Sequence, residues 1–244
     1  MKKQLFTILI GAVALLTSCG EDDPDPLFSG ENEVQVSLYS KPDVTIQTTD
    51  HSGNPIDQTL SYNRQVFVDL DAVSETTGAD TMAVHYSDAS YTHFDLWTAG
   101  ADEATGSEGW DIVLAWYNGK AFDPSTSTYI PYMMTGALIN KGVVQALKLN
   151  KEAIEEEGKT FISYDDVTFD DAEGMTLSAD VAAIGEDWKK LNFSNFQYEM
   201  VADQYYIIKS TNGVYFKLAF TGFYSDNDGT KGFPKFKFER ILAE

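Results

Sequence analysis

Few side chains in this sequence have the types and spacing that catalysis requires. A catalytic site needs a nucleophile with a base and an orienting group, or a metal ion with several ligands. The sequence contains no Gly-x-Ser-x-Gly motif, no histidine pair at helical spacing and no phosphate-binding glycine loop. Of its three histidines, His51 falls in an expected turn, and His85 and His93 would share a strand face only if the chain ran straight between them. The sequence therefore favours a binding protein over an enzyme.

Two acidic features could also carry chemistry, and neither is specific. Asp226-Asn227-Asp228-Gly229 resembles part of a calcium loop, but aligning Gly229 with the glycine of such a loop places Tyr224 where the first carboxylate ligand belongs. A loop between two strands is the better interpretation. The chain has 38 acidic residues, so a carboxylate pair with glycosidase spacing could form in many places, and the sequence gives no reason to choose one.

The first twenty residues predict export. Two lysines precede an uncharged run over 5–16, which is shorter than the roughly 20 residues of a membrane-spanning helix. Leu16-Thr17-Ser18-Cys19 follows and resembles the lipobox of bacterial lipoproteins, and Cys19 is the only cysteine in the chain. We therefore expect residues 1–18 to be a lipoprotein signal peptide, and Cys19 to carry the lipid that anchors the mature chain to a membrane.

The segment after Cys19 is acidic and contains proline. Residues 19–32 include Glu21-Asp22-Asp23-Pro24-Asp25-Pro26, which cannot bury apolar surface and predicts a solvated, lipid-anchored tether. Acidic residues directly after the lipidated cysteine also resemble the surface-export signal of Bacteroidetes lipoproteins, which implies the outer face of the outer membrane. Residues 33–244 are long enough to bury a proper core and are expected to form a single β-rich domain.

The net charge excludes one class of partner. The whole chain carries −21, and removing residues 1–18, which hold two lysines and no acidic residue, leaves −23. A protein with this charge repels nucleic acid and anionic lipid. The excess is spread along the chain, which is typical of a surface that keeps a protein in solution.

Alternation of polar and apolar residues dominates the chain after residue 32. Strands are predicted at 33–39, 64–70, 83–86, 92–97, 110–116, 129–140, 143–147, 204–209, 214–220 and 233–238. Asn212-Gly213 between two aromatic and β-branched runs indicates a hairpin. The best short helix covers 151–157 and ends at Gly158. The sequence predicts an all-β fold of packed antiparallel sheets, sandwich-like, with one or two short helices.

Several segments together suggest a family. They are Trp110-Asp111-Ile112-Val113-Leu114, Tyr132-Met133-Met134-Thr135-Gly136-Ala137-Leu138-Ile139-Asn140, Gly185-Glu186-Asp187-Trp188-Lys189-Lys190, Tyr205-Tyr206-Ile207-Ile208-Lys209 with Asn212-Gly213-Val214-Tyr215-Phe216-Lys217-Leu218, and Lys231-Gly232-Phe233-Pro234-Lys235-Phe236. In order and spacing, over residues 80–242, they resemble the HmuY-like lipoproteins of Bacteroidetes. The resemblance implies an all-β, surface-anchored hemophore for iron acquisition, which binds haem and delivers it to a TonB-dependent haem receptor in the outer membrane.

The family holds haem iron with two side chains, histidines or methionines, from two loops that flank the strand containing Trp188. Asn195 stands where one of these histidines would follow Phe-Ser in this sequence. The resemblance then implies Met200, near that position, and Met175, in the other loop, as the two axial ligands. Thioether sulfur is an accepted axial donor to haem iron.

Further residues complete this hypothesis. Phe196 and Tyr198 are expected beside the porphyrin, and Met133-Met134, which fall on a predicted strand, are the reserve candidates for iron ligation. Two alternatives stay open. One is a surface adhesion or accessory lipoprotein that keeps only the scaffold, and the other is a glycan-binding or glycan-cleaving lipoprotein that uses aromatic side chains as a platform.

Overall fold

The structure is a computed structural model, and part of the chain is described by it. The described residues are 27–28, 33–39, 44–49, 54–60, 64–72, 82–88, 94–98, 109–123 and 125–243. Residues 1–18 and Cys19 lie outside these ranges, as do most of residues 19–32, so the signal peptide, the lipid anchor and the tether stay predictions. His51 and His93 also lie outside them. Within the described ranges, no helix has the length and apolar character needed to cross a membrane.

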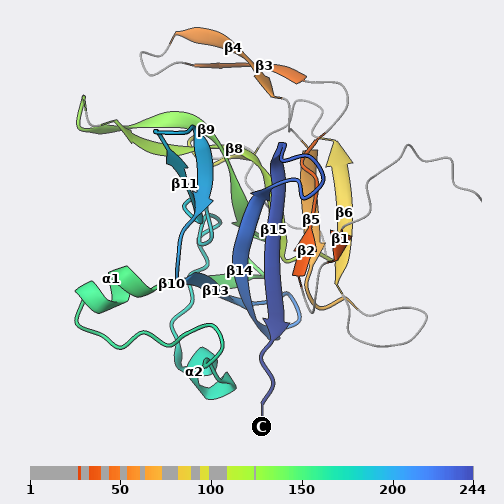
Figure 1. The fold of residues 1–244 in the computed structure, drawn as a ribbon, viewed down its shortest axis with the longest axis vertical. Helices are drawn as coiled ribbons and strands as arrows, with labels where there is room; N and C mark the ends of the chain where they lie inside the picture. Colours follow the sequence, from red (N-terminus) through yellow and green to blue (C-terminus); the bar gives the residue numbers. More distant parts are fainter. Residues whose placement is uncertain are drawn as a thin grey trace, which may run out of the picture.

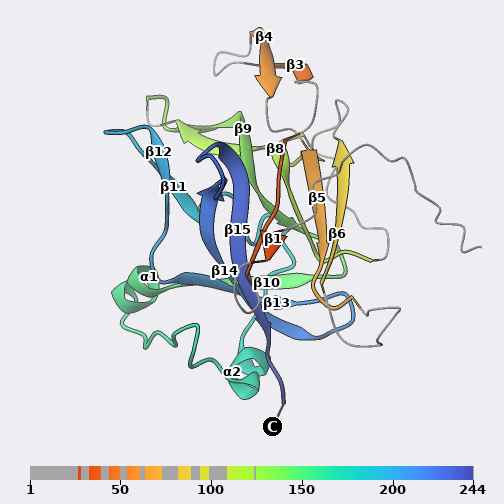
Figure 2. The same ribbon diagram turned by 45° about the vertical axis from the view of Figure 1, so that its right-hand side comes forward.

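Two β-sheets form the body of the domain (Figures 1 and 2). The first has six antiparallel strands in the order β1 (Leu27–Phe28), β2 (Glu33–Gln35), β15 (Lys231–Arg240), β14 (Tyr215–Tyr224), β13 (Gln204–Lys209) and β10 (Gln145–Asn150). The second has the order β6 (Ala83–Asp88), β5 (Arg64–Asp69), β8 (Ile112–Asp123) and β7 (Phe94–Asp95), and β9 (Thr128–Ile139) pairs with β8 along its whole length. Among the described strand pairs, β7 with β8 is the single parallel one.

Two separate hairpins accompany the sheets. β3 (Val44–Thr49) pairs with β4 (Pro55–Leu60), and β11 (Lys189–Asn192) pairs with β12 (Gln197–Met200). Figures 1 and 2 show the β11–β12 hairpin beside the long β8–β9 hairpin, at the same end of the molecule. The two hairpins therefore bring residues that are far apart in the sequence to one place.

The central core fills the space between the two sheets. In β13, Tyr206 and Ile208 face this core, while Tyr205 and Ile207 face an outer core on the other side of the six-stranded sheet. This follows from the alternation of side chains along a strand. Each fully buried side chain of this size contributes roughly 1.5–3 kcal/mol, so both faces of the sheet stabilise the fold.

Two short helices cover the outer face of the six-stranded sheet. α1 (Lys151–Glu156) begins after Asn150, whose side chain accepts a hydrogen bond from the backbone N–H of Ala153 at 3.0 Å. α2 (Phe169–Gly174) begins with a reciprocal capping pair between Thr168 and Asp171. The predicted helix is confirmed at α1, and Gly158 follows it with a φ of +72°, a conformation that glycine adopts without strain.

The all-β prediction is confirmed, with differences in detail. The Asn212-Gly213 turn joins β13 to β14, and Gly213 has a φ of +80°. The 226–229 segment is the predicted loop, between β14 and β15. The strand predicted at 92–97 begins outside the described residues, and within them only Phe94–Asp95 pair with β8, so it ends two residues earlier than predicted. The β3–β4 hairpin and α2 were not predicted individually.

Candidate functional site

A pocket of about 320 Å³ lies between the β8–β9 hairpin and the β11–β12 hairpin, and we call it the hairpin pocket. It is lined by Trp116, Ala121, Tyr132, Met133, Met134, Thr135, Glu186, Lys189, Tyr198 and Phe223. Small-molecule sites have volumes of about 300–1,000 Å³ and mostly apolar walls with a few polar groups. The hairpin pocket is at the lower end of this volume range, and its wall combines aromatic rings and two thioethers with one lysine, one threonine and one glutamate.

A close backbone contact positions the segment that leads into β11. Ala137 and Gly185 exchange two backbone hydrogen bonds, each of 2.9 Å, so the segment before β11 lies directly on β9. A Cβ atom on Gly136 would lie 2.5 Å from the carbonyl oxygen of Gly185, and Gly185 itself has a φ of +70°. Both positions therefore require glycine. The contact carries Trp188 and Lys189 to the pocket.

Stacked aromatic rings form the floor beneath the pocket. The ring of Trp188 lies parallel to that of Phe220, with 4.1 Å between their centroids, and Trp188 is only 2% exposed. Phe223 contacts both Trp188 and Tyr198 edge to face, at 5.6 and 5.3 Å. The backbone N–H of Tyr198 donates to the hydroxyl of Tyr224 at 2.6 Å, which ties β12 to β14. These contacts fix the floor of the pocket to the six-stranded sheet through β14.

Lys189 is the buried cation of the pocket. It is 8% exposed, and its ammonium donates to the backbone carbonyl of Thr135. The ammonium nitrogen lies 4.0 Å from the ring centroid of Trp188, 5.1 Å from that of Phe223 and 5.6 Å from that of Tyr198. Burial lowers the pKa of Lys189 to about 7, although nearby carboxylates oppose the shift. Aromatic faces attract a cation at these distances.

Two further polar groups lie at the edges of the pocket. The hydroxyl oxygen of Thr135 is buried and has no hydrogen-bond partner among the described residues. Glu186 accepts a hydrogen bond from the hydroxyl of Tyr117, and burial, with the charge of Glu186, raises the pKa of that hydroxyl. One carboxylate oxygen of Glu186 is thus already engaged, whereas the Thr135 hydroxyl is not.

The reserve methionines lie in the pocket. Met133 is 6% exposed and Met134 is half-buried, and as neighbours on β9 they point to opposite faces of that strand. The sulfur of Met134 rests over Gly119, where a Cβ atom would lie 3.0 Å from it. Tyr198, which the resemblance placed beside the porphyrin, also lines the pocket. The structure thus brings these three predicted residues together.

Met175 and Met200 are not brought to one pocket. Met175 follows α2 and packs against the outer core, while Met200 ends β12 and packs against the central core. Because the six-stranded sheet separates these two cores, the two sulfur atoms lie on opposite sides of it. Neither residue lines the hairpin pocket.

Exposed aromatic rings stand at the tips of both hairpins. Phe122, Tyr129 and Tyr132 on the β8–β9 hairpin are 57%, 62% and 58% exposed, and Phe193 and Phe196 in the β11–β12 turn are 77% and 75% exposed. Exposed apolar groups that gather at one place mark an interaction site. Phe196, predicted beside the porphyrin, thus lies in the exposed turn between β11 and β12 and does not line the hairpin pocket.

Phe196 also holds a strained backbone conformation, and we expect its replacement by glycine to stabilise the fold. Its φ is +56°, which is unfavourable for a bulky side chain by roughly 1–2 kcal/mol. Phe196→Gly should raise the free energy of unfolding by up to about 1 kcal/mol, after the entropic cost of glycine. Phe193→Gly, at a position without positive φ, should lower it slightly. Urea denaturation measures both, and a loss of stability in both variants would contradict this account.

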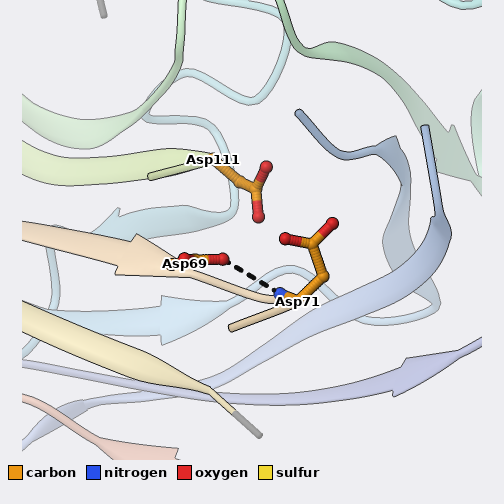
Figure 3. A group of neighbouring side chains, drawn as sticks. All are labelled: Asp69, Asp71 and Asp111. Carbon is orange, nitrogen blue, oxygen red and sulfur yellow. Dashed lines mark hydrogen bonds between the residues drawn. The ribbon is translucent and has the colours of Figure 1, made fainter. Parts of the chain in front are cut away.

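A cluster of three aspartates lies where β5 ends, away from the hairpin pocket (Figure 3). Carboxylate oxygens of Asp69, Asp71 and Asp111 all lie within 4.8 Å of one another. Asp111 is fully buried and accepts from the backbone N–H groups of Leu70 and Thr211, at 2.8 and 2.7 Å. Burial nevertheless raises the pKa of Asp111.

The hydrogen bonds of this cluster assign it a structural role. Asp71 accepts hydrogen bonds from Ser210 and from the side chain of Asn212, the latter at 2.9 Å. Asp71 and Asp111 thereby connect the end of β5 and the start of β8 to the β13–β14 turn. The Trp110-Asp111 motif of the sequence is explained by this connection between the two sheets.

Asp69 should make stability depend on pH. Burial, a hydrogen bond with Asp71 and the charge of Asp111 raise its pKa from 3.8 to about 6. The folded state therefore holds the proton more tightly, so this contribution to stability is complete below about pH 4 and is lost as the pH rises through 6. Asp69→Asn should stabilise the protein at pH 7, by on the order of 1 kcal/mol because the group is partly exposed, and should have little effect at pH 4.

Asp95→Asn is the matched control for this prediction. Asp95 is partly buried, but the N–H groups of Thr98 and Trp97 lower its pKa below the usual value. The same loss of charge should therefore destabilise the protein at pH 7. Chemical denaturation at the two pH values measures both variants, and equal effects at Asp69 and Asp95 would refute the assignment.

The fold and the site define a class of protein: an all-β sandwich with a ligand pocket between two hairpins. The chain belongs to the HmuY family. A family model described as HmuY protein matches residues 61–238, and this range includes every residue of the hairpin pocket. No curated protein matches the chain.

Solved structures of low identity resemble the chain over most of its length. A candidate lipoprotein from Bacteroides fragilis is 11% identical, with 90% of this chain and 95% of that chain covered and a TM-score of 0.36. A candidate HmuY-like heme-binding protein from Bacteroides vulgatus is 13% identical, with 87% and 92% covered and a TM-score of 0.35. The apo HmuY analog of Tannerella forsythia is 14% identical, with 90% and 100% covered and a TM-score of 0.29.

Sequence reasoning did not single out the polar residues of the pocket. Lys189 follows a tryptophan and precedes Lys190, a pattern that is typical of an exposed strand end. Thr135 lies within an apolar run on β9 and carries no motif. One signal could have identified Thr135. A polar residue inside an otherwise apolar strand is expected to be buried, and a buried polar group needs a hydrogen-bond partner.

Proposed function

We propose that this chain is a lipid-anchored, haem-binding protein of the outer-membrane surface, which binds haem in the hairpin pocket and delivers it to a TonB-dependent receptor. Membership of the HmuY family supports this proposal. The observation that carries it is the meeting of Met133, Met134 and Tyr198 with aromatic walls in one pocket. Nothing in the proposal requires catalysis, so the protein acts as a carrier and not as an enzyme.

The chemistry of the pocket fits a porphyrin with iron at its centre. Apolar aromatic walls suit the macrocycle, and thioether sulfur is an accepted axial donor. Because Met133 and Met134 point to opposite faces of β9, only one of them at a time would supply an axial ligand to the iron, and Trp116, Tyr198 and Phe223 would contact the ring. The resemblance implies Met175 and Met200 as ligands instead. These two residues pack on opposite sides of the six-stranded sheet, so we rank this pair second.

The membrane attachment rests on the sequence. Cys19 would carry the lipid, and residues 19–32 would hold the domain away from the bilayer. Lipid with two or more chains gives durable anchoring, so the domain itself needs no membrane contact. The acidic residues after Cys19 favour the outer face of the outer membrane. Transfer of haem to a receptor at the same surface is then a short-range step.

A hemin titration tests the proposal. The protein from residue 20 onward is titrated with hemin under oxidising and under reducing conditions, and the Soret absorption is recorded. We expect a shifted band that saturates at one hemin per chain. Met133→Ala and Met134→Ala should change the band or weaken binding by about tenfold, which corresponds to 1.4 kcal/mol. Absence of any shifted band in both conditions would refute haem binding.

Matched methionine variants locate the ligands. Met175→Ala removes the same side chain from the outer core, so it should leave the spectrum unchanged if the hairpin pocket is the site. Met200→Ala serves the same purpose at the end of β12. A spectrum that changes in Met175→Ala and Met200→Ala, and in neither pocket variant, would restore the pair implied by the resemblance.

The exposed aromatic tips favour one second candidate, glycan binding. Phe122, Tyr129 and Tyr132 lie together on the β8–β9 hairpin, and exposed aromatic faces stack on sugars. Oligosaccharide should then quench tryptophan fluorescence, because Trp116 and Trp188 lie near this hairpin. Quenching by oligosaccharide without any response to hemin would favour this function over haem carriage.

A further inference from the structure

Lys189 is a buried cation that forms no ion pair with any described residue. Its ammonium has three donors, and one of them is used by the carbonyl of Thr135. Among the described residues, no carboxylate lies within ion-pair distance of it, and the same ammonium lines the hairpin pocket. Burying a charge is costly unless the charge is paired. The unused donors are therefore available to an anion in the pocket.

Thr135 supplies an independent second group. The residue is 6% exposed, its hydroxyl oxygen has no hydrogen-bond partner in the part of the chain that the structure describes, and it lines the same pocket. Buried hydroxyls in native proteins nearly always have a partner. Its carbonyl already holds Lys189, so the hydroxyl and the ammonium are neighbours. A hydroxyl and an ammonium together can bind the two oxygens of one carboxylate.

The nearby acidic groups do not fill this role. Glu186 accepts from Tyr117, and Asp187 forms an ion pair with Lys148 at the surface. Each therefore already has another partner, and the two act on Lys189 only through their charge, without an ion pair to it. The chain as a whole repels anions, because its net charge is −21. Recognition of an anionic ligand must therefore come from a local, desolvated cation, where charge-assisted hydrogen bonds are strong.

We propose that the hairpin pocket recognises a carboxylate of its ligand through the ammonium of Lys189 and the hydroxyl of Thr135. The inference rests on the proposed function, in which the carboxylate is a propionate of the porphyrin. It adds that recognition depends on the propionate and not only on the iron. A carboxylate at hydrogen-bond distance also favours the protonated amine of Lys189. Metal-free porphyrin with free propionates is then a ligand in its own right.

The test compares an acid with its neutral ester. Hemin, metal-free protoporphyrin IX and protoporphyrin IX dimethyl ester are each titrated into the protein from residue 20 onward, with porphyrin and tryptophan fluorescence as readouts. We expect hemin and the metal-free acid to bind, and the ester to bind at least about tenfold more weakly than the acid. This comparison uses the unmodified chain, so it does not depend on the folding of a variant.

Two lysine variants assign the effect. Lys189→Met keeps the length of the side chain and should weaken binding of the acid by about tenfold, with little change for the ester. Lys190→Met removes the same charge from the exposed side of β11 and should leave both affinities within about twofold. Thr135→Val, which conserves shape, should also reduce the preference for the acid.

The outcomes separate the two proposals. Equal affinity for acid and ester, with hemin still bound, overturns the carboxylate inference and leaves haem binding intact. Binding of hemin without any binding of the metal-free acid also overturns the carboxylate inference and leaves haem binding intact. Equal losses in Lys189→Met and Lys190→Met would reduce the effect to general charge and also overturn the inference. If no porphyrin binds, with or without iron, the proposed function fails and the inference with it.

Discussion

Gly136→Ala is expected to lower the free energy of unfolding by about 3 kcal/mol and to weaken hemin binding. The added Cβ atom would lie 2.5 Å from the carbonyl oxygen of Gly185 and 2.9 Å from the ring of Tyr117. The first of these neighbours is backbone, so relief requires movement of the whole segment before β11. Overpacking of this kind typically costs 1–3 kcal/mol, and about 3 is expected where backbone must move. That segment carries Lys189, so the pocket should change shape as well.

Gly174→Ala is the control for this substitution. Gly174 is the last residue of α2, and a Cβ atom there would contact nothing within 4 Å. The added methyl group should be neutral, or stabilise the helix by up to about 1 kcal/mol. Urea denaturation and hemin titration of both variants give the result. A stability of Gly136→Ala equal to that of the unmodified chain would contradict the close contact between β9 and the segment before β11.

Asp111→Ala should be the other severe change, with a loss of roughly 4 kcal/mol. Its carboxylate accepts from the backbone N–H of Leu70 and from both the N–H and the hydroxyl of Thr211. Alanine would leave two backbone donors without this acceptor, the buried N–H of Leu70 and the partly buried N–H of Thr211, and each such group costs about 1–3 kcal/mol. The repulsion that Asp111 exerts on Asp69 and Asp71 would be relieved, which offsets a part of the loss.

Asp111→Asn separates the hydrogen bonds from the charge. The amide keeps one oxygen and the shape of the side chain, so we expect a smaller loss of about 1–2 kcal/mol. Both variants should retain hemin binding at temperatures where they are folded, because Asp111 lies away from the hairpin pocket. A larger loss in Asp111→Asn than in Asp111→Ala would refute the structural role of the cluster.

The sheets could be predicted because their signal is local. Alternation in β13 and β14 and the Asn212-Gly213 turn specify a hairpin from neighbouring residues alone. The β3–β4 hairpin was not predicted because most residues of β3 and β4 are polar, and Thr45, Gln47 and Asp57 among them are exposed. α2 is only six residues long, and its signal is the Thr168 and Asp171 capping pair.

The ligand pair could not be predicted from spacing. Met175 and Met200 lie in the two segments that flank Trp188, but the side of the sheet on which each packs depends on long-range strand pairing. Met175 follows α2, which covers the outer face of the six-stranded sheet, and Met200 belongs to a hairpin on its inner side. Strand order is a non-local property that no local pattern in this sequence encodes.

The buried lysine illustrates the same limit at a single residue. Lys189 and Lys190 are adjacent on β11, so one of them must face inward. Because the two side chains are identical, the sequence alone does not determine which. The register of β11 with β12, in which Lys189 pairs with Met200, decides it.

The central claim is that a porphyrin occupies the hairpin pocket, and the methyl groups of the methionines test it directly. The chain from residue 20 onward contains Met82, Met133, Met134, Met175 and Met200. NMR spectra of methyl-labelled methionine, assigned by single substitutions, are recorded before and after addition of one equivalent of hemin. We predict that the signals of Met133 and Met134 shift strongly or vanish, while those of Met82 and Met175 stay in place. A shift of Met175 with Met133 and Met134 unchanged would contradict the claim.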